Sequence, residues 1–347
     1  MGENEVKNEE KKAKKDLDLL NKLKAMPGGL VIVPLVIAVV LATFVPQVFQ
    51  IGGYVTALFY EGNACMMGFF LIVCGSMIDV KQVGMPLYKG VIMTGTKLLL
   101  GIILGMIVGA VCGPEGFLGI APFVLIAAIT NSNGSLYISL SSQFGNATDT
   151  GAISILSLND GPFFTLVALG ATGLANIPIN SLIAVIVPLL IGFIWGNLDK
   201  GFRDACKAAQ PIVTFFMTIS IGAKTDVQTI LTAGASGIVL GLISAATSVI
   251  FFFVINLLLP KKERNAMGAA IGTTALNSAM TPAAVAEADP TMEEFVPMAT
   301  AQCATASIIT LFLCPFITAA FDRYMQKKKK GIYSPEGWAY AKVAGNN

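Results

Sequence analysis

The sequence predicts an all-α integral membrane protein with ten transmembrane helices. The first observation is compositional: hydrophobic residues make up 54% and charged residues 13% of the 347 residues, whereas soluble domains typically carry about 25% charged residues. The second is that apolar runs of about twenty residues recur along nearly the whole chain, each long enough to cross a hydrocarbon core of about 30 Å as a helix. A soluble protein could not bury that much apolar surface.

The apolar runs set the approximate limits of the ten spans. Short polar connections separate them, so no water-soluble domain of any size is expected. The predicted spans are 28–48, 56–79, 89–112, 117–143, 148–171, 178–198, 207–224, 230–258, 264–288 and 294–323.

The third observation is the placement of Lys and Arg, which predicts that both termini are cytoplasmic. With that orientation, all but two of the 23 basic residues lie in tails or loops on the inner side. The two exceptions are Lys97, inside the third span, and Lys224, at an outer helix end. Cytoplasmic loops carry an excess of Lys and Arg, and an odd number of helices would break the alternation. We therefore expect a multi-pass membrane protein with both ends inside the cell.

The two halves of the chain resemble each other. VIVPLVI at 31–37 in the first span is matched by VIVPLLI at 185–191 in the sixth, and GSMIDV at 75–80 by GAKTDV at 222–227. The two matches occur in the same order, which predicts two five-helix repeats, 27–175 and 176–323. Because five is odd, the second repeat enters the membrane from the opposite side, and inverted repeats of this kind recur in secondary transporters.

The tails and several absent motifs narrow the function classes. The N-terminal tail, 1–26, is rich in Lys and Glu; an interfacial helix and a solvated tail are both compatible with it, and it lacks the apolar region of a signal peptide. The C-terminal tail is 324–347. The chain has no histidine and no phosphate-binding loop, and its basic clusters mark helix ends. We expect no metal site, no nucleic-acid partner and no enzymatic activity, with the lipid bilayer as the surroundings.

Polar runs interrupt the fourth and ninth spans at corresponding places in the two repeats. The first run is TNSNGS at 130–135, and the second comprises GTT at 272–274 and NSAMTP at 277–282. Broken helices expose backbone groups that lipid cannot satisfy, so they occur where they line a cavity. Paired interruptions are the best sequence pointer to a transport site. The alternative is a polar kink that neighbouring helices satisfy.

Two charged residues are expected at membrane depth. Asp160, next to Asn159, lies near the middle of the fifth span, and Lys97 lies about 12 Å from the inner end of the third. Such residues are costly in a bilayer and mark function by default, although a structural ion pair is the alternative. Asp149, Glu287 and Asp289 lie near span ends, where we expect them to be solvated.

Three glycines in the third span, Gly101, Gly105 and Gly109, repeat every fourth residue. This spacing lets two helices approach closely. The contact can lie within one chain or between protomers, which leaves a homo-oligomer open.

Several segments together resemble the family of 2-keto-3-deoxygluconate permeases. They are PGGLVIVPLV from Pro27, TNSNGSLYISLSSQFG from Thr130, SLNDGPFFTLVALGATGLA from Ser157 and WGNLD from Trp195. The resemblance runs from about Pro27 to Phe321. It implies a fold like that of the bile-acid–sodium symporters, with two discontinuous helices, here spans four and nine, crossing between a panel domain and a core domain. Family members carry Glu at the position of Asp160.

The resemblance also implies a protein of the bacterial inner (cytoplasmic) membrane. Its implied activity is proton-coupled symport of 2-keto-3-deoxygluconate or a related sugar acid into the cell by alternating access. On this hypothesis, Asp160 with Asn159 binds the coupling proton, and protonation releases Lys97 to pair with the substrate carboxylate. The residues expected at the substrate are Lys97, Asn131, Ser132, Asn133, Thr273, Thr274, Asn277 and Ser278.

Other functions stay open at this stage. Oxygen atoms beside Asp160 could equally coordinate Na⁺, which would give a sodium-coupled organic-anion symporter or a sodium/proton antiporter of the same fold. A channel or sensor would move substrate without accumulating it. An intramembrane enzyme would have only Asp160 and Lys97 as a catalytic pair. No cofactor is expected apart from the coupling ion, H⁺ or alternatively Na⁺.

Overall fold

The structure, a computed structural model, describes residues 18–25, 29–78, 84–156, 162–225 and 227–338, and nearly all of its regular secondary structure is helical. Within these ranges, extended pairing is limited to one isolated bridge between Phe117 and Ile120. The α-helices are α2 (Leu19–Ala25), α3 (Gly29–Phe44), α4 (Gly53–Phe59), α5 (Asn63–Ser76), α6 (Met85–Cys112), α7 (Pro122–Thr130), α8 (Gly134–Phe144), α9 (Ala147–Gly151), α10 (Ile153–Leu156), α11 (Phe163–Thr172), α12 (Ile179–Leu198), α13 (Lys200–Gly222), α14 (Val227–Leu258), α15 (Met267–Ala270), α16 (Thr281–Ala288) and α17 (Val296–Lys327). Short 3₁₀ helices are η1 (Pro46–Phe49), η3 (Lys261–Glu263), η4 (Leu276–Met280), η5 (Pro290–Phe295) and η6 (Gly331–Tyr333).

Several of these helices are long and apolar enough to cross a membrane. In the described part of the chain, four stretches qualify by length and composition, and α4 with α5, bent by 56°, forms a fifth candidate span. α3 and α11 are shorter apolar helices. The four stretches are Met85–Cys112, Ile179–Leu198, Leu231–Leu258 and Pro290–Tyr333. The protein is therefore a helical integral membrane protein, and the total of ten spans stays a prediction.

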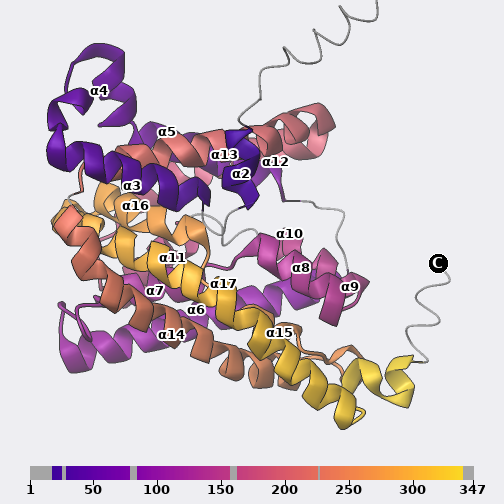
Figure 1. Ribbon diagram of the computed structural model, residues 1–347. Helices are drawn as coiled ribbons and strands as arrows, with labels where there is room; N and C mark the ends of the chain where they lie inside the picture. The colour runs from indigo at the N-terminus through magenta and orange to yellow at the C-terminus, as the bar shows by residue number, and fades with distance from the viewer. Residues whose placement is uncertain (1–17, 26–28, 79–83, 157–161, 226, 339–347) are drawn as a thin grey trace, which may run out of the picture.

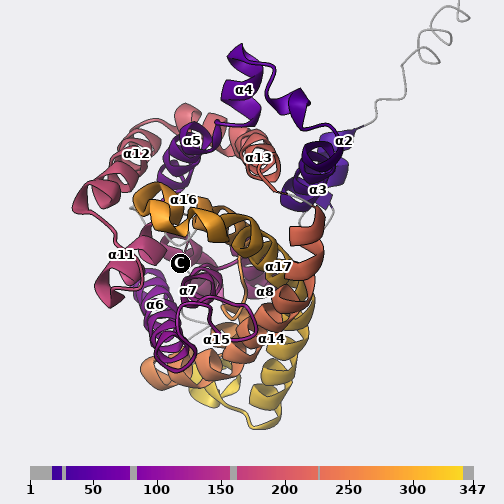
Figure 2. The same cartoon turned by 90° about the vertical axis from the view of Figure 1, so that its left-hand side faces the viewer.

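The helices gather into two groups, which Figures 1 and 2 show from two sides. In one group, α3 and α5 pack against α13, and α12 packs against α5; we call these the panel helices. In the other, α6 packs against α7 and α14 against α17, with the short helices α8 to α11, α15 and α16 among them; we call these the core helices. The two interrupted segments both belong to the core helices.

Glycines allow the panel helices to approach closely, in a reciprocal pattern. A Cβ atom at Gly75 on α5 would overlap the carbonyl oxygen of Leu189 on α12, and one at Gly222 on α13 would lie 2.8 Å from the carbonyl oxygen of Leu35 on α3. In the two matching sequence segments, Gly75 corresponds to Gly222 and Leu35 to Leu189. Equivalent contacts in swapped order are what a two-fold-related repeat requires, although the inverted repeat itself stays a prediction.

The glycine stripe of α6 makes its contact within the chain. A Cβ atom at Gly101 would lie 2.8 Å from the methyl group of Thr130, one at Gly105 would overlap the side chain of Ile126, and one at Gly109 would lie 3.1 Å from Leu174. α7, which carries Ile126 and Thr130, is buried along its whole length. The glycines therefore bring α6 against the half-helix that leads into the first interruption.

Several predicted spans differ from single helices, among them 56–79, which covers part of α4 and all of α5. The span predicted at 117–143 consists of α7 and α8, and the one at 264–288 of α15, η4 and α16. Both breaks lie at the polar runs, where side chains compete for backbone hydrogen bonds. The span predicted at 148–171 contains α9, α10 and α11, and residues 157–161 lie outside the described part.

Candidate functional site

The first interruption covers residues 131–133. α7 ends at Thr130, and Asn131 has an extended backbone with φ −85° and ψ 145°. The side-chain oxygen of Asn133 accepts a hydrogen bond from the amide of Leu136 at 3.0 Å and so caps α8. This cap explains why helix resumes at Gly134, since asparagine satisfies a free amide of the first turn. The N-terminal end of α8, with its partial positive charge, lies at the break.

The second interruption covers residues 271–275. The short helix α15 ends at Ala270, an irregular segment follows, and the chain continues through η4 into α16. Neighbouring side chains satisfy part of its backbone. The hydroxyl of Thr310 on α17 accepts from the amide of Thr274 at 3.0 Å, and the hydroxyls of Ser278 and Ser307 donate to the carbonyl of Ala275 at 2.6 and 2.7 Å.

The two interruptions meet, although they are far apart in sequence. The amide of Asn133 donates to the hydroxyl of Thr273 at 3.0 Å. Lys97 joins the same place from α6, because its Nζ donates to the carbonyls of Ile271 at 2.5 Å and Thr273 at 3.0 Å. Its ammonium also lies 5.3 Å from the ring centroid of Phe251. A single buried region therefore contains both breaks and Lys97, whose side chain is 1% exposed.

Several polar atoms of this region have no hydrogen-bond partner in the described part of the chain. They are Oδ1 of Asn131, Oγ of Ser132 and Oγ1 of Thr274. The three residues are at most 2% exposed. Nearly all buried polar groups in proteins are hydrogen-bonded, and each exception needs an explanation. A bound ligand with hydroxyl groups, or a cation, would supply the missing partners.

The remaining predicted site residues differ in placement. Asn277 is half-buried in η4, and Ser278 is buried with its hydroxyl bonded to Ala275. Asn159 and Asp160 lie outside the described residues. The structure thus brings together Lys97, Asn131, Ser132, Asn133, Thr273 and Thr274, and their roles in substrate binding stay predictions.

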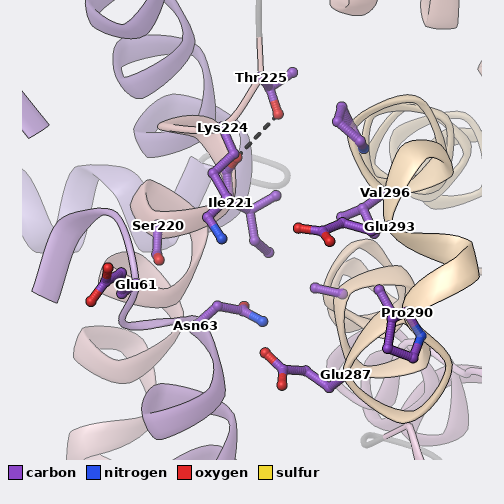
Figure 3. A pocket seen from close by; sticks show the side chains of 13 residues that line it. Glu61, Asn63, Ser220, Ile221, Lys224, Thr225, Glu287, Pro290, Glu293 and Val296 are labelled. Carbon is purple, nitrogen blue, oxygen red and sulfur yellow. Dashed lines mark hydrogen bonds between the residues drawn. The ribbon is translucent and has the colours of Figure 1, made fainter. Parts of the chain in front are cut away.

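A cavity of about 380 Å³ lies between the panel and core helices. Figure 3 shows Ser220, Lys224 and Asn63 on one side of it, facing Glu287 and Glu293 on the other. It also touches Ala283 and Ala286 of α16, the helix that begins beside the second interruption. Because Lys224 was predicted at an outer helix end, this cavity is predicted to open on the outer side. Glu287 is exposed there, as predicted.

The sequence did not predict a buried cluster of ion pairs that the structure contains. The ammonium of Lys89 on α6 lies 2.7 Å from Asp149 Oδ1 on α9 and 2.9 Å from Glu263 Oε2 on η3, and all three side chains are 0% exposed. Asn146 donates to Glu263, and Asn265 donates to Asp149. Burial would raise the pKa of Glu263, but the ammonium of Lys89 and the hydrogen bonds from Asn146 and Thr148 hold it below its ordinary value. The cluster joins the two halves of the core.

The prediction that Asp149 and Asp289 are solvated is therefore wrong. Asp149 is buried in the ion cluster because Lys89 and Asn265 replace water around it. Asp289 is 6% exposed, and accepts from the amide of Asn176 at 2.7 Å and from the hydroxyl of Thr291 at 2.7 Å. One local pattern in the sequence could have indicated the role of Asp149: Asn146 and Asp149 form a capping box, which is readable from sequence. The partners that are distant in sequence could not be predicted in this way.

Paired helix breaks that meet in the buried core of a helical membrane protein define the class as a membrane transporter. The family model of 2-keto-3-deoxygluconate permeases matches residues 20–327. The chain is 44% identical over 303 residues to 2-keto-3-deoxygluconate permease 1 of Salmonella typhimurium, covering 87% of this chain and 95% of that one. It is 30% identical over 319 residues to 2-keto-3-deoxygluconate permease of Bacillus subtilis, covering 90% and 96%.

The chain belongs to the 2-keto-3-deoxygluconate permease family, as its motifs predicted. Because this is a family of permeases, the protein is a transporter and not an enzyme.

Proposed function

We propose that this protein imports 2-keto-3-deoxygluconate, or a closely related sugar acid, together with a proton by alternating access. The substrate class follows from the printed names of its relatives. The observation that carries the proposal is the set of unpartnered polar atoms on Asn131, Ser132 and Thr274 beside Lys97. A hydroxylated 2-oxo acid offers both the hydroxyl groups and the single carboxylate that such a site would bind.

The carboxylate of the substrate would lie near the N-terminal end of α8 and the ammonium of Lys97. Partial positive charge at helix N-termini favours anions. Lys97 now donates to the carbonyls of Ile271 and Thr273, so binding requires that it exchange at least one carbonyl for the substrate. The hydroxyl and keto oxygens would be met by the side chains of Asn131, Ser132, Thr273, Thr274 and Ser278.

Alternating access would move the core helices against the panel helices. The cavity at Lys224 and Glu287 lies between these two groups, and on the predicted topology this conformation is open to the outside. The cavity has one ammonium, of Lys224, against the carboxylates of Glu61, Glu287 and Glu293. An acidic vestibule attracts cations, including protons. Opening on the other side would require the reverse tilt of the two groups, which an inverted repeat makes available.

Asp160, with Asn159, is the proposed carrier of the coupling proton, in the bacterial inner membrane with both termini cytoplasmic. A protonated Asp160 would no longer compete with the substrate carboxylate for Lys97, so that the proton and the substrate bind together. Sodium coupling is the alternative, because amide and hydroxyl oxygens also suit Na⁺. Experiment must distinguish it from proton coupling.

Replacing Asp160 by asparagine should abolish accumulation driven by a pH gradient, while exchange of internal for external substrate persists at least in part. Exchange needs no net proton movement, so it survives the loss of the proton carrier. The measurement is uptake of labelled 2-keto-3-deoxygluconate into proteoliposomes, in both modes. Asp204→Asn, an exposed carboxylate at the predicted cytoplasmic surface, is the matched control. Full proton-driven uptake by Asp160→Asn would exclude this role.

A further inference from the structure

We propose that the pocket between the C-terminal ends of α14 and α17 binds one anionic phospholipid of the surrounding membrane. Its headgroup phosphate would lie among Lys261, Arg264 and Lys330, and its acyl chain would lie in the adjoining apolar groove at Phe253 and Phe321. This site is separate from the interrupted helices and from the cavity beside Lys224.

The pocket for the headgroup has a volume of about 580 Å³ and a positive charge. Three basic side chains line it, those of Lys261, Arg264 and Lys330, against one carboxylate, that of Glu336. Among the described residues, none of the three basic groups has a carboxylate within ion-pair distance, since the ion pairs found are those of Lys89. A phosphate would supply the missing counter-charge, and Arg and Lys both bind phosphate through charge-assisted hydrogen bonds.

The groove for the acyl chain adjoins this pocket. It has a volume of about 390 Å³ and is lined by Phe253, Ile317, Ala320, Phe321 and Tyr324. Phe253 and Tyr324 also line the basic pocket, so the two spaces adjoin. The side chain of Phe253 is 58% exposed, as expected for a surface that faces lipid rather than water. A free phosphate ion would bind in the basic pocket but would make no contact with the groove.

Along both helices, apolar residues come first and basic residues follow, which matches the acyl chains and the headgroup of a phospholipid. Phe253 lies in α14, and Lys261 and Arg264 follow the end of that helix at Leu258. Phe321 lies in α17, and Lys330 follows the end of that helix at Lys327. Both helices run toward the predicted cytoplasmic side, and Figure 1 shows their ends side by side. The basic residues therefore lie at headgroup depth and the aromatic residues deeper. Basic pockets between transmembrane helices on the cytoplasmic side suit anionic headgroups.

The wall of the pocket is built by specific contacts. The amide of Ile332 donates to the carbonyl of Arg264 at 3.0 Å. Gly331 has φ +60°, and a Cβ atom there would overlap that same carbonyl, so glycine is required. Below, the rings of Phe252 and Phe321 stack at 4.0 Å between centroids. These contacts hold η6 against the backbone of Arg264 before a ligand binds, which lowers the cost of binding.

Phosphatidylglycerol should stabilise the purified protein through this site. In detergent micelles, saturating dioleoylphosphatidylglycerol is expected to raise the thermal unfolding midpoint by about 3 °C or more. Dioleoylphosphatidylethanolamine and inorganic phosphate at equal concentration should not. The variant Lys261→Gln/Arg264→Gln/Lys330→Gln should lose the effect, whereas the control Lys24→Gln/Lys200→Gln/Lys207→Gln, which removes three exposed lysines elsewhere, should keep it.

A second variant covers the case in which the triple variant fails to fold. Ala320→Phe fills the apolar groove without changing charge and should also lose the response to phosphatidylglycerol. The proposal is overturned if phosphatidylethanolamine stabilises the protein equally, if inorganic phosphate reproduces the full effect, or if Ala320→Phe responds as the unmodified protein does.

Discussion

Substituting Lys97 by glutamine should lower the rate of substrate uptake about 100-fold or more while the fold is retained. The glutamine amide keeps two N–H groups near the carbonyls of Ile271 and Thr273, which Lys97 now satisfies, on a side chain one bond shorter. It has no charge with which to bind a carboxylate. A 100-fold loss corresponds to about 2.7 kcal/mol, within the range for losing a charged partner of a buried ionic hydrogen bond. Initial uptake rates in proteoliposomes measure the effect.

The control for Lys97 is Lys224, which lines the cavity between the panel and core helices and is exposed. Lys224→Gln should change uptake by about 5-fold or less, mainly through KM, because an exposed charge acts on approach of the substrate rather than on the bound complex. If Lys97→Gln retained uptake at a similar level to Lys224→Gln, the assignment of Lys97 to the substrate would be wrong.

Replacing Lys89 by methionine should destabilise the protein by about 3–5 kcal/mol. Methionine leaves the carboxylates of Asp149 and Glu263 buried together without their counter-ion, and removing one partner of a buried ion pair typically costs this much. The cluster joins α6 and α9 to η3, so the loss should loosen the contact between the two halves of the core. Thermal and denaturant unfolding of the purified variant in detergent measures the change.

Glu263→Gln should be much milder, costing about 1 kcal/mol. Lys89 keeps its contact with Asp149 at 2.7 Å, and the cluster, with one ammonium and two carboxylates, loses its excess negative charge. Oε1 of Glu263 has no partner in the described part of the chain. The NH₂ group of a glutamine can therefore take the place of Oε1, while its oxygen takes the place of Oε2, and no strong contact is lost. If Lys89→Met lost no more stability than the about 1 kcal/mol expected for Glu263→Gln, the ion pairs would contribute little.

The helix interruptions were predictable because their cause is local. A run of hydroxyl and amide side chains around Asn131 and Asn277 breaks an apolar helix wherever it occurs, since such side chains compete for backbone hydrogen bonds. Their meeting was expected from the family resemblance, which implies that spans four and nine cross. The contact of Asn133 with Thr273 bears this out.

The partners of the charged residues were not predictable in the same way. Lys89, Asp149 and Glu263 lie in three segments far apart in sequence, and each one at a span end has solvation as its simplest explanation. Only packing of α9 and η3 against α6 removes the water. The bonds of Lys97 to the carbonyls of Ile271 and Thr273 were hidden for a related reason: backbone acceptors have no signature in a sequence.

The partner of the glycine stripe of α6 could not be predicted from the sequence, and the structure identifies one such partner. Spacing alone predicts a close helix approach but does not name the partner. Gly101 and Gly105 pack against α7 of the same chain because the half-helix is fully buried beside them.

The most direct test of proton-coupled sugar-acid import is uptake of labelled 2-keto-3-deoxygluconate into proteoliposomes, with pH and sodium gradients imposed separately. We predict accumulation above the external concentration when the outside is more acidic, with no requirement for sodium, and collapse of the accumulation when a protonophore removes the pH gradient. Accumulation that follows a sodium gradient and ignores the pH gradient would contradict the proposed coupling, and equilibration without accumulation under either gradient would contradict secondary active transport.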